Sequence, residues 1–230
     1  ARHLDQLERG EWEIKCPLCH EDMKPVPTDE SRVNPHNQYA VSKYSQELYA
    51  LTLGKRFGIS TVVLRYSITQ GPRQSFYNAY SGILRIFTTR LLNGLPPIIY
   101  ENGKQLRDYV HVKDVAEANL LALESPSANF GVFNVGGSKA TTVLEYAKLL
   151  IALLRKDMEP QSPSQFRFSD TRHIVSDISK IKGLGWQPKT PLEQIIREYI
   201  DWAQEQVEVS DYYAEAERVM RQQGVLRSAK

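Results

Sequence analysis

The spacing of hydrophobic and polar positions predicts helices and strands that alternate along the chain. Apolar residues at helical spacing, Leu48, Leu51 and Leu53 among them, indicate a helix over 39–57 that ends at Gly58. β-Branched and apolar runs predict strands at 60–66, 97–100, 109–112, 130–135 and 165–168. Further helices are expected at 79–92, 113–124, 141–154, 178–182 and 191–206. This alternation indicates an α/β fold with a largely parallel sheet.

The two ends of the chain depart from this alternation. Residues 1–38 contain several prolines and are expected to be irregular, because proline disfavours helix. The tail, 206–230, carries apolar residues at helical spacing and is expected to form an amphipathic helix that packs on the body or forms an interface. Within the body, Thr141 is expected to open a helix, with Glu145 four residues later.

Composition and charge exclude several classes of protein. Hydrophobic residues make up 41% and charged residues 24% of the 230 positions, which is ordinary for a globular protein. A net charge of +2 is too small to indicate nucleic acid or a membrane surface as the main partner. No apolar run approaches the roughly 20 residues of a membrane span. The polar first ten residues do not resemble a signal peptide, so a cytoplasmic protein is expected.

The two cysteines of the chain, Cys16 and Cys19, stand in a Cys-Pro-Leu-Cys turn that His20 follows. Such a turn can present two thiolates to a zinc ion, which takes four ligands. Two unpaired thiols in a proline-rich loop are one alternative. A redox pair is another, although such pairs usually occupy a helix start, which the prolines disfavour. A zinc ribbon that binds nucleic acid is less favoured, because no basic stripe accompanies the cysteines.

Tyr39 and Lys43 form a candidate pair for proton transfer. Four residues apart at the start of a helix, they share one face. A nearby ammonium lowers the pKa of a tyrosine from about 10 toward neutrality, which suits exchange of a proton with a sugar hydroxyl. The spacing alone is a weak signal, because it recurs at Tyr100 and Tyr109 in strand or turn contexts. A solvated lysine on a surface helix remains the alternative.

Five further motifs follow this pair in order along the chain. They are Leu64-Arg-Tyr with Gly71-Pro-Arg-Gln74, Gly103-Lys-Gln-Leu-Arg107-Asp-Tyr-Val-His-Val112, Phe133-Asn-Val-Gly136, Arg167-Phe-Ser-Asp170 and Leu184-Gly-Trp186-x-Pro188. Together, from about Asn34 to Ala203, the ordered set resembles the C-terminal part of the extended short-chain dehydrogenases, the nucleotide-sugar epimerases and dehydratases. The resemblance implies the C-terminal part of a Rossmann-like doubly wound parallel sheet and a smaller α/β substrate-binding lobe.

The resemblance also implies roles for residues around the cofactor. Tyr39 would be the catalytic acid and base. Lys43 would bind the nicotinamide ribose of NAD and tune Tyr39. Tyr66 and Ser67, at the end of a predicted strand, would lie beside the nicotinamide.

A second group of residues matches positions that hold the nucleotide-diphosphate sugar. Arg107 and Arg167 correspond to arginines that bind the diphosphate, whose oxygens suit guanidinium forks. For either arginine taken alone, a surface salt bridge would be the simpler interpretation. Asp170 corresponds to an acid that accepts a hydrogen bond from the nucleoside ribose, and Tyr100 lies near the place of the base.

The chain departs from the family pattern at three points. Ile68 stands where many members have an asparagine that touches the substrate. None of the 13 glycines forms the fingerprint that binds dinucleotide phosphates, and the upstream catalytic serine or threonine has no place. These absences predict that the first half of the enzyme lies outside the chain. Residues 1–33 resemble the end of a Cys/His-bearing insert found in enzymes similar to dTDP-L-rhamnose 4-epimerases, which implies a structural zinc whose other ligands lie upstream.

Four segments are expected. They are the end of the insert at 1–33, the last part of the Rossmann domain at 34–75, a substrate-binding lobe interleaved with a last Rossmann strand and helix at 76–205, and a helical tail at 206–230. The implied activity is NAD-dependent epimerisation at C4 of a nucleotide-diphosphate sugar through a 4-keto sugar, in a homodimeric full-length enzyme. A 4,6-dehydratase or a decarboxylase of the family is the alternative. A fragment that binds NAD weakly and does not catalyse is another.

Overall fold

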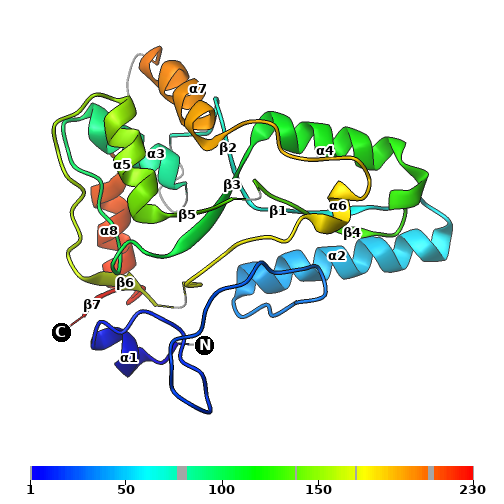
Figure 1. The fold of residues 1–230 in the computed structure, drawn as a ribbon, viewed down its shortest axis with the longest axis horizontal. Helices are drawn as coiled ribbons and strands as arrows, with labels where there is room; N and C mark the ends of the chain where they lie inside the picture. The colour runs from blue at the N-terminus through cyan, green and yellow to red at the C-terminus, as the bar shows by residue number, and fades with distance from the viewer. Residues whose placement is uncertain (1, 77–81, 138, 169, 207–209, 230) are drawn as a thin grey trace.

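The computed structural model describes residues 2–76, 82–137, 139–168, 170–206 and 210–229 (Figure 1). Its helices are α1 (Leu4–Glu8), α2 (Gln38–Phe57), α3 (Ile83–Leu92), α4 (Val112–Glu124), η1 (Pro126–Ala128), α5 (Val143–Leu153), α6 (Ser179–Lys182), α7 (Leu192–Gln204) and α8 (Tyr213–Gln222). Its strands are β1 (Val63–Tyr66), β2 (Ile68–Gln70), β3 (Leu106–His111), β4 (Val132–Val135), β5 (Ala140–Thr142), β6 (Gln165–Arg167) and β7 (Leu226–Ser228). The predicted α/β fold with parallel strands is confirmed.

One sheet pairs two strands that lie far apart in the sequence. β1 and β4 run parallel, with Leu64 opposite Phe133, and lie between α2 and α4 in Figure 1. The core beside them contains Trp186, whose indole nitrogen donates to the Asp114 carbonyl oxygen at 3.0 Å. Gly54 is the one buried residue of α2, so the helix keeps most of its surface exposed. The helix approaches the chain closely at this point: a Cβ on Gly54 would lie 2.1 Å from the Thr61 hydroxyl oxygen.

A second sheet lies next to the first and has the strand order β2-β3-β5. β2 and β3 are parallel, whereas β5 runs antiparallel to β3. The main hydrophobic core lies between α3, α5 and α7; its buried members include Leu84, Phe87, Leu91, Tyr146, Leu150, Ile196 and Tyr199. No helix among the described residues combines the length and the apolar character needed to cross a membrane.

Several predicted elements differ from those observed. The strand expected at 97–100 is wrong: only Ile98 forms a bridge, with Gln161, and Pro97 has no amide hydrogen for a ladder. Thr142 rather than Thr141 caps α5, through a capping box in which its hydroxyl accepts from the Glu145 amide at 3.1 Å. Residues 79–81 of the helix expected at 79–92 lie outside the described residues.

The two ends of the chain also differ from the prediction. The first 38 residues are not wholly irregular, because they include α1. The tail is not one helix: α8 ends before Gly224, whose φ of 68° lies in the left-handed region that favours glycine. β7 then pairs antiparallel with β6, with Phe166 opposite Arg227. The tail is thus part of a third small sheet, and Val209 of the predicted helix lies outside the described residues.

Candidate functional site

The first two turns of α2 carry Tyr39 and Lys43. Asn37 caps the helix, its side-chain oxygen accepting a hydrogen bond from the Ala40 amide at 2.8 Å. One turn after Tyr39, the Lys43 ammonium lies 5.7 Å from the centre of the Tyr39 ring. Tyr39 is 70% exposed. The helix therefore brings the two side chains onto one open face, as its period requires.

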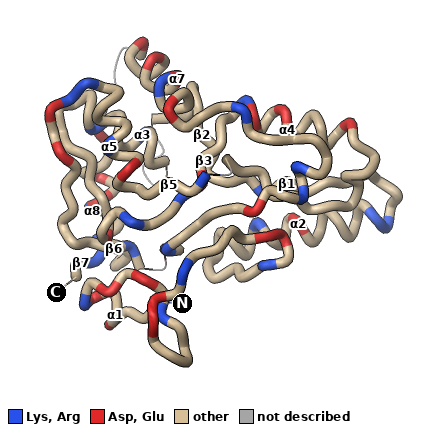
Figure 2. The backbone as a smooth tube through the Cα atoms, viewed as in Figure 1, with Lys and Arg blue, Asp and Glu red and all other residues tan. Residues whose placement is uncertain are grey.

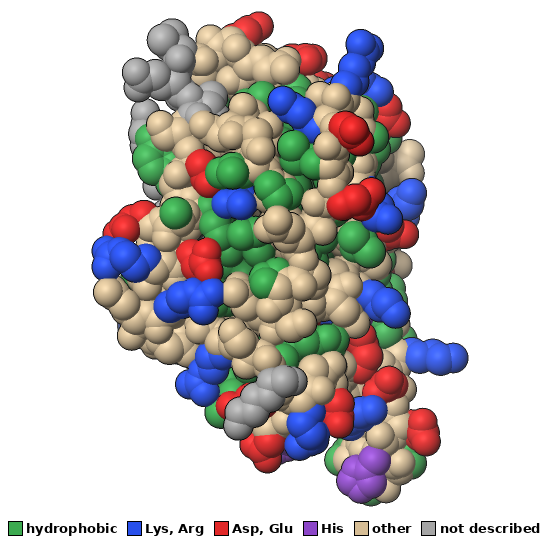
Figure 3. Space-filling view, turned by 90° about the vertical axis from the view of Figure 1, so that its left-hand side faces the viewer, with side chains coloured by type: hydrophobic (Ala, Val, Ile, Leu, Met, Phe, Trp, Pro, Cys, Tyr) green, Lys and Arg blue, Asp and Glu red, His purple; other side chains and the backbone are tan. Residues whose placement is uncertain are grey.

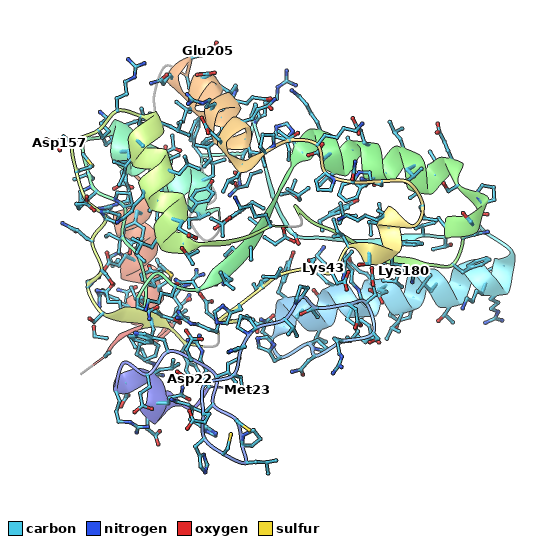
Figure 4. All side chains as sticks on the ribbon, in the orientation of Figure 1. Asp22, Met23, Lys43, Asp157, Lys180 and Glu205 are labelled. Atoms are coloured by element: carbon cyan, nitrogen blue, oxygen red, sulfur yellow. The ribbon has the colours of Figure 1, made fainter. Side chains whose placement is uncertain are left out.

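The four residues expected around NAD line one hollow of about 870 Å³, here called the α2 hollow. Tyr39 and Lys43 come from α2, and Figure 4 labels Lys43 near the beginning of that helix. Tyr66 and Ser67 come from the end of β1 and the residue after it. The Tyr66 hydroxyl donates to the Asn119 side chain at 2.9 Å.

Arg65 attaches α2 to β1 in the wall of this hollow. Its guanidinium donates to both carboxylate oxygens of Glu47, at 2.9 and 2.7 Å, and to the Glu30 carbonyl oxygen at 2.9 Å. The hydrogen bond to Glu47 raises the pKa of Arg65. Arg65 is thus engaged in holding the helix rather than open to a ligand.

Asp108 lies at the junction behind Ser67 and was not singled out from the sequence. Its fully buried carboxylate accepts hydrogen bonds from the Ser67 hydroxyl at 2.9 Å, the Gly137 amide at 2.7 Å and the Ser176 amide at 3.3 Å. Burial raises the pKa of Asp108, and the bond from Ser67 opposes that effect. Gly136 must be small, because a Cβ there would meet Asp108 Oδ2 at 2.1 Å. The available signal was an acidic residue directly before the strand predicted at 109–112.

The four residues expected to bind the nucleotide sugar line a second cavity, of about 350 Å³, here called the β6 pocket. They are Tyr100, Arg107, Arg167 and Asp170. Figure 3 faces the end of the molecule that carries α5, α8 and β6, and shows hydrophobic side chains gathered at its centre with charged ones around them.

The C-terminal helix supplies a wall of the β6 pocket that sequence reasoning missed. Tyr213 and Met220 of α8 line the cavity. The Tyr213 and Tyr100 hydroxyl groups lie 2.9 Å apart, and burial raises the pKa of both. The only signal was their helical spacing in the tail, which indicated packing but not the place of contact.

The two arginines of the β6 pocket differ in their partners. Arg167 pairs with Asp170 at 2.8 Å, and its guanidinium carbon lies 5.8 Å from the centre of the Tyr100 ring. Arg107 donates instead to the carbonyl oxygens of Leu106, Arg172 and Thr171, at 2.8, 2.8 and 3.1 Å.

Within the part of the chain that the structure describes, Arg107 forms no ion pair. Burial lowers the pKa of Arg107, against the opposing charge of Asp170. A guanidinium held by neutral carbonyls in a pocket retains its positive charge for an anion.

One strand separates the two cavities. Thr69 of β2 lines the α2 hollow, and its neighbour Ile68 lines the β6 pocket. Successive side chains of a strand point to opposite faces, so β2 forms a partition with one cavity on each side. Ile68, which replaces an expected asparagine, thus faces the β6 pocket.

The cysteines form a separate turn at the N-terminal end. The Cys16 amide donates to the Glu21 carbonyl oxygen at 2.8 Å and the Met23 amide to that of Ile14 at 2.8 Å, and Figure 4 labels Met23 on this loop. The backbone amide of Cys19 lowers the pKa of the Cys16 thiol. No group of three or more His, Cys, Asp or Glu side chains placed to hold a metal occurs among the described residues.

Comparison with known proteins finds one matching family model and relatives that are sugar-nucleotide epimerases. The model of the NAD dependent epimerase/dehydratase family matches residues 19–136. A putative UDP-glucose 4-epimerase of Methanocaldococcus jannaschii is 33% identical over 77% of this chain and 57% of its own length. The dTDP-L-rhamnose 4-epimerase of Burkholderia thailandensis is 31% identical over 88% of the chain and 55% of its own length.

A solved structure agrees with these sequence matches. The UDP-glucose 4-epimerase of Thermotoga maritima, crystallised with UDP-glucose, superposes with a TM-score of 0.74 at 38% identity, covering 82% of this chain and 60% of that one. The chain thus spans little more than half the length of the relatives that it matches.

The raised pKa of Asp108 predicts a pH dependence of stability. A raised folded-state pKa gives a stabilising contribution that is full below the ordinary value of 3.8 and is lost as pH rises through the folded value. Asp108→Asn cannot ionise. We therefore expect the free energy of unfolding of the unaltered chain, relative to this variant, to fall as pH rises above the ordinary value of 3.8. Urea denaturation at each pH measures the difference.

Asp177→Asn is the matched control, with the opposite sign. The hydrogen bond from Ser179 lowers the pKa of Asp177, so its contribution is present above its ordinary pKa and lost as pH falls. The free energy of unfolding of the unaltered chain, relative to Asp177→Asn, should therefore rise with pH only below the ordinary value of 3.8 and stay constant above it. A difference for Asp108→Asn that stayed constant or rose with pH would contradict the role assigned to Asp108.

Proposed function

The chain belongs to the NAD dependent epimerase/dehydratase family, and from this premise we propose that the whole protein epimerises a nucleotide-diphosphate sugar at C4. One observation carries the proposal: a Tyr-Lys pair lines one cavity, and an arginine without an ion pair among the described residues lines the cavity across β2. The first cavity suits proton exchange with a sugar hydroxyl, and the second suits a diphosphate.

Tyr39 would exchange the proton of the sugar 4-hydroxyl. The Lys43 ammonium lies 5.7 Å from the centre of the Tyr39 ring, and the Tyr39 hydroxyl would take up that proton and later return it. NAD, when bound, would supply the oxidation and reduction at the sugar carbon. The hollow that Tyr39 and Lys43 share with Tyr66 and Ser67 fits the nicotinamide end of this cofactor.

The β6 pocket would hold the nucleotide. Arg107 would bind diphosphate oxygens, and Arg167 would join it on the other side of the anion. Asp170 would accept a hydrogen bond from the ribose, and the rings of Tyr100 and Tyr213 would flank the base. Held in this way, the sugar would be oriented toward Tyr39. Binding would thus supply in advance the loss of entropy that orientation for the reaction requires.

Replacement of Tyr39 tests the catalytic role. In the whole protein, Tyr39→Phe should lower the turnover of dTDP- or UDP-sugars between about a hundredfold and about ten-thousandfold, because the phenol that carries the proton is gone. Chromatography of the sugar products measures the rate. Tyr49→Phe is the matched control, since Tyr49 lies on α2 and is also 70% exposed, yet does not line the hollow. Full activity of Tyr39→Phe would exclude this role.

The products also separate the two reactions of the family. A 4,6-dehydratase is the second candidate, because the matched family contains both enzyme types. Interconversion of C4 epimers supports the proposal, whereas accumulation of a 4-keto-6-deoxy sugar in the same assay would replace it with the dehydratase.

We propose that Cys16 and Cys19 are two ligands of a structural zinc ion in the whole protein. Their hairpin places both thiols at one turn, and the lowered pKa of Cys16 favours the thiolate that zinc requires. Purified whole protein should contain about one zinc per chain by elemental analysis, and Cys16→Ser should contain far less. Equal zinc contents in the unaltered protein and in Cys16→Ser would exclude the site. Ser31→Ala, which alters an exposed serine on the same segment, is the control.

We also propose that the whole protein is a homodimer that pairs through α2. Leu48, Leu53 and Phe57 leave an apolar surface on this helix, between 45% and 64% exposed. Leu53→Lys should reduce the mass measured by light scattering from that of a dimer to that of a monomer. Leu123→Lys on α4 is the control, since Leu123 is 85% exposed but lies on another helix. A monomeric unaltered protein would contradict the proposal.

A further inference from the structure

A buried network of charged side chains joins the N-terminal segment, residues 2–13, to the wall of the β6 pocket. Arg2 donates to the Glu101 carboxylate at 2.7 Å and to the Asp170 carbonyl oxygen at 2.8 Å. The side chains of Arg2 and Glu101 are only 4% and 5% exposed. Figure 1 places this segment, with α1, next to β6 and β7, and Figure 2 shows acidic and basic residues along it.

Glu13 is the second contact from this segment. Its Oε1 atom accepts from the Arg172 guanidinium at 2.5 and 3.1 Å, and its Oε2 atom lies 2.8 Å from His173 Nε2. The Leu106 amide donates to His173 Nδ1 at 3.2 Å, so the ring proton lies on Nε2 and is donated to Glu13. Arg172 in turn donates to Glu101 at 2.6 Å. The two arginines and two glutamates of the network balance in charge.

Arg172 links Glu13 to Arg107: its side chain binds Glu13, and its main-chain carbonyl oxygen accepts a hydrogen bond from Arg107. Arg107 donates to the carbonyl oxygens of Thr171 and Arg172, at 3.1 and 2.8 Å. Arg172 is 1% exposed and lies between Glu13 and Glu101, so its main chain has little freedom while both carboxylates are present. Trp12, next to Glu13, adds an aromatic contact with Phe166 of β6 at 5.9 Å between ring centres.

We propose that Glu13 is a positioning residue for the anion site of the β6 pocket: it fixes Arg172, and the main chain of Arg172 fixes Arg107. The inference rests on the proposed function, because the anion that Arg107 would meet is the diphosphate of a nucleotide sugar. It assigns to the N-terminal segment a part in substrate binding, although none of residues 2–13 lines the pocket.

The direction in which replacement of Glu13 changes the affinity for an anion distinguishes a positioning role from a purely electrostatic one. Burial acts to raise the pKa of Glu13, but hydrogen bonds from Arg172 and His173 outweigh it, so its pKa lies below the ordinary value and the group is ionised at neutral pH. Removal of this negative charge would leave a surplus positive charge near the pocket, which by itself strengthens binding of an anion. Loss of positioning weakens it.

Nucleotide binding by the whole protein is the test. Glu13→Ala should raise the dissociation constant of dTDP or UDP, measured by calorimetry, between about tenfold and about a hundredfold. The dissociation constant of NAD should not change, because the α2 hollow contains none of these groups. Glu11→Ala is the matched control: Glu11 is two residues away and pairs with Arg9 on the surface at 3.1 Å. Its nucleotide affinity should equal that of the unaltered protein.

Each outcome decides between the two proposals. Unchanged or tighter nucleotide binding by Glu13→Ala would overturn the positioning role alone. Absence of dTDP and UDP binding by the unaltered protein would instead overturn the proposed function. If Glu13→Ala fails to fold, Glu13→Gln replaces it, because the amide keeps the shape and one acceptor while it loses the charge. A fall in unfolding midpoint without a change in nucleotide affinity would show that Glu13 is structural only.

Discussion

The carboxylate of Asp108 joins three segments that lie far apart in the chain. It accepts hydrogen bonds from the residue after β1, from the loop after β4 and from the stretch before α6. A buried carboxylate requires such donors, because its charge is otherwise too costly to remove from water. Both cavities depend on this junction, since Ser67 lines one and Arg107, the neighbour of Asp108 on β3, lines the other. Successive side chains of β3 point to opposite faces, so Asp108 faces the junction and its neighbour Arg107 faces the β6 pocket.

The two cavities differ in their exposure. Tyr39 and Lys43 lie on an exposed helix face, where the proposed reaction would exchange a proton with a bound sugar. Arg107 is half-buried and forms no ion pair among the described residues, so its charge is available to an anion in the pocket. The partition between them is a three-residue strand, so a ligand that reaches from one cavity to the other must pass the end of β2. A nucleotide-diphosphate sugar is a ligand of that extended kind.

Local sequence pattern was sufficient for the long helices and for the face shared by Tyr39 and Lys43, because both depend on a period that residues in one helix display. It was insufficient for β2, β5 and β7, since three residues are too few for a period and their pairing is set by distant strands. Tyr100, Arg107, Arg167 and Asp170 meet in one pocket, which the ordered family motifs implied but no local pattern could indicate. Asp108 stands within one of these motifs without an implied role, and Glu13 lies outside them; the partners of both are remote in sequence.

The contact between Glu13 and Arg172 spans 159 positions of the chain. At roughly 5 to 20 residues per second, a ribosome makes Glu13 about 8 to 32 seconds before Arg172 exists. During that time Glu13 lacks its arginine partner, whereas α2, whose helical hydrogen bonds are local, can already form. Long loops also close slowly, because their entropy must be lost before the contact is gained. The segment that carries Glu13 therefore reaches its native place only after the chain has been made as far as Arg172.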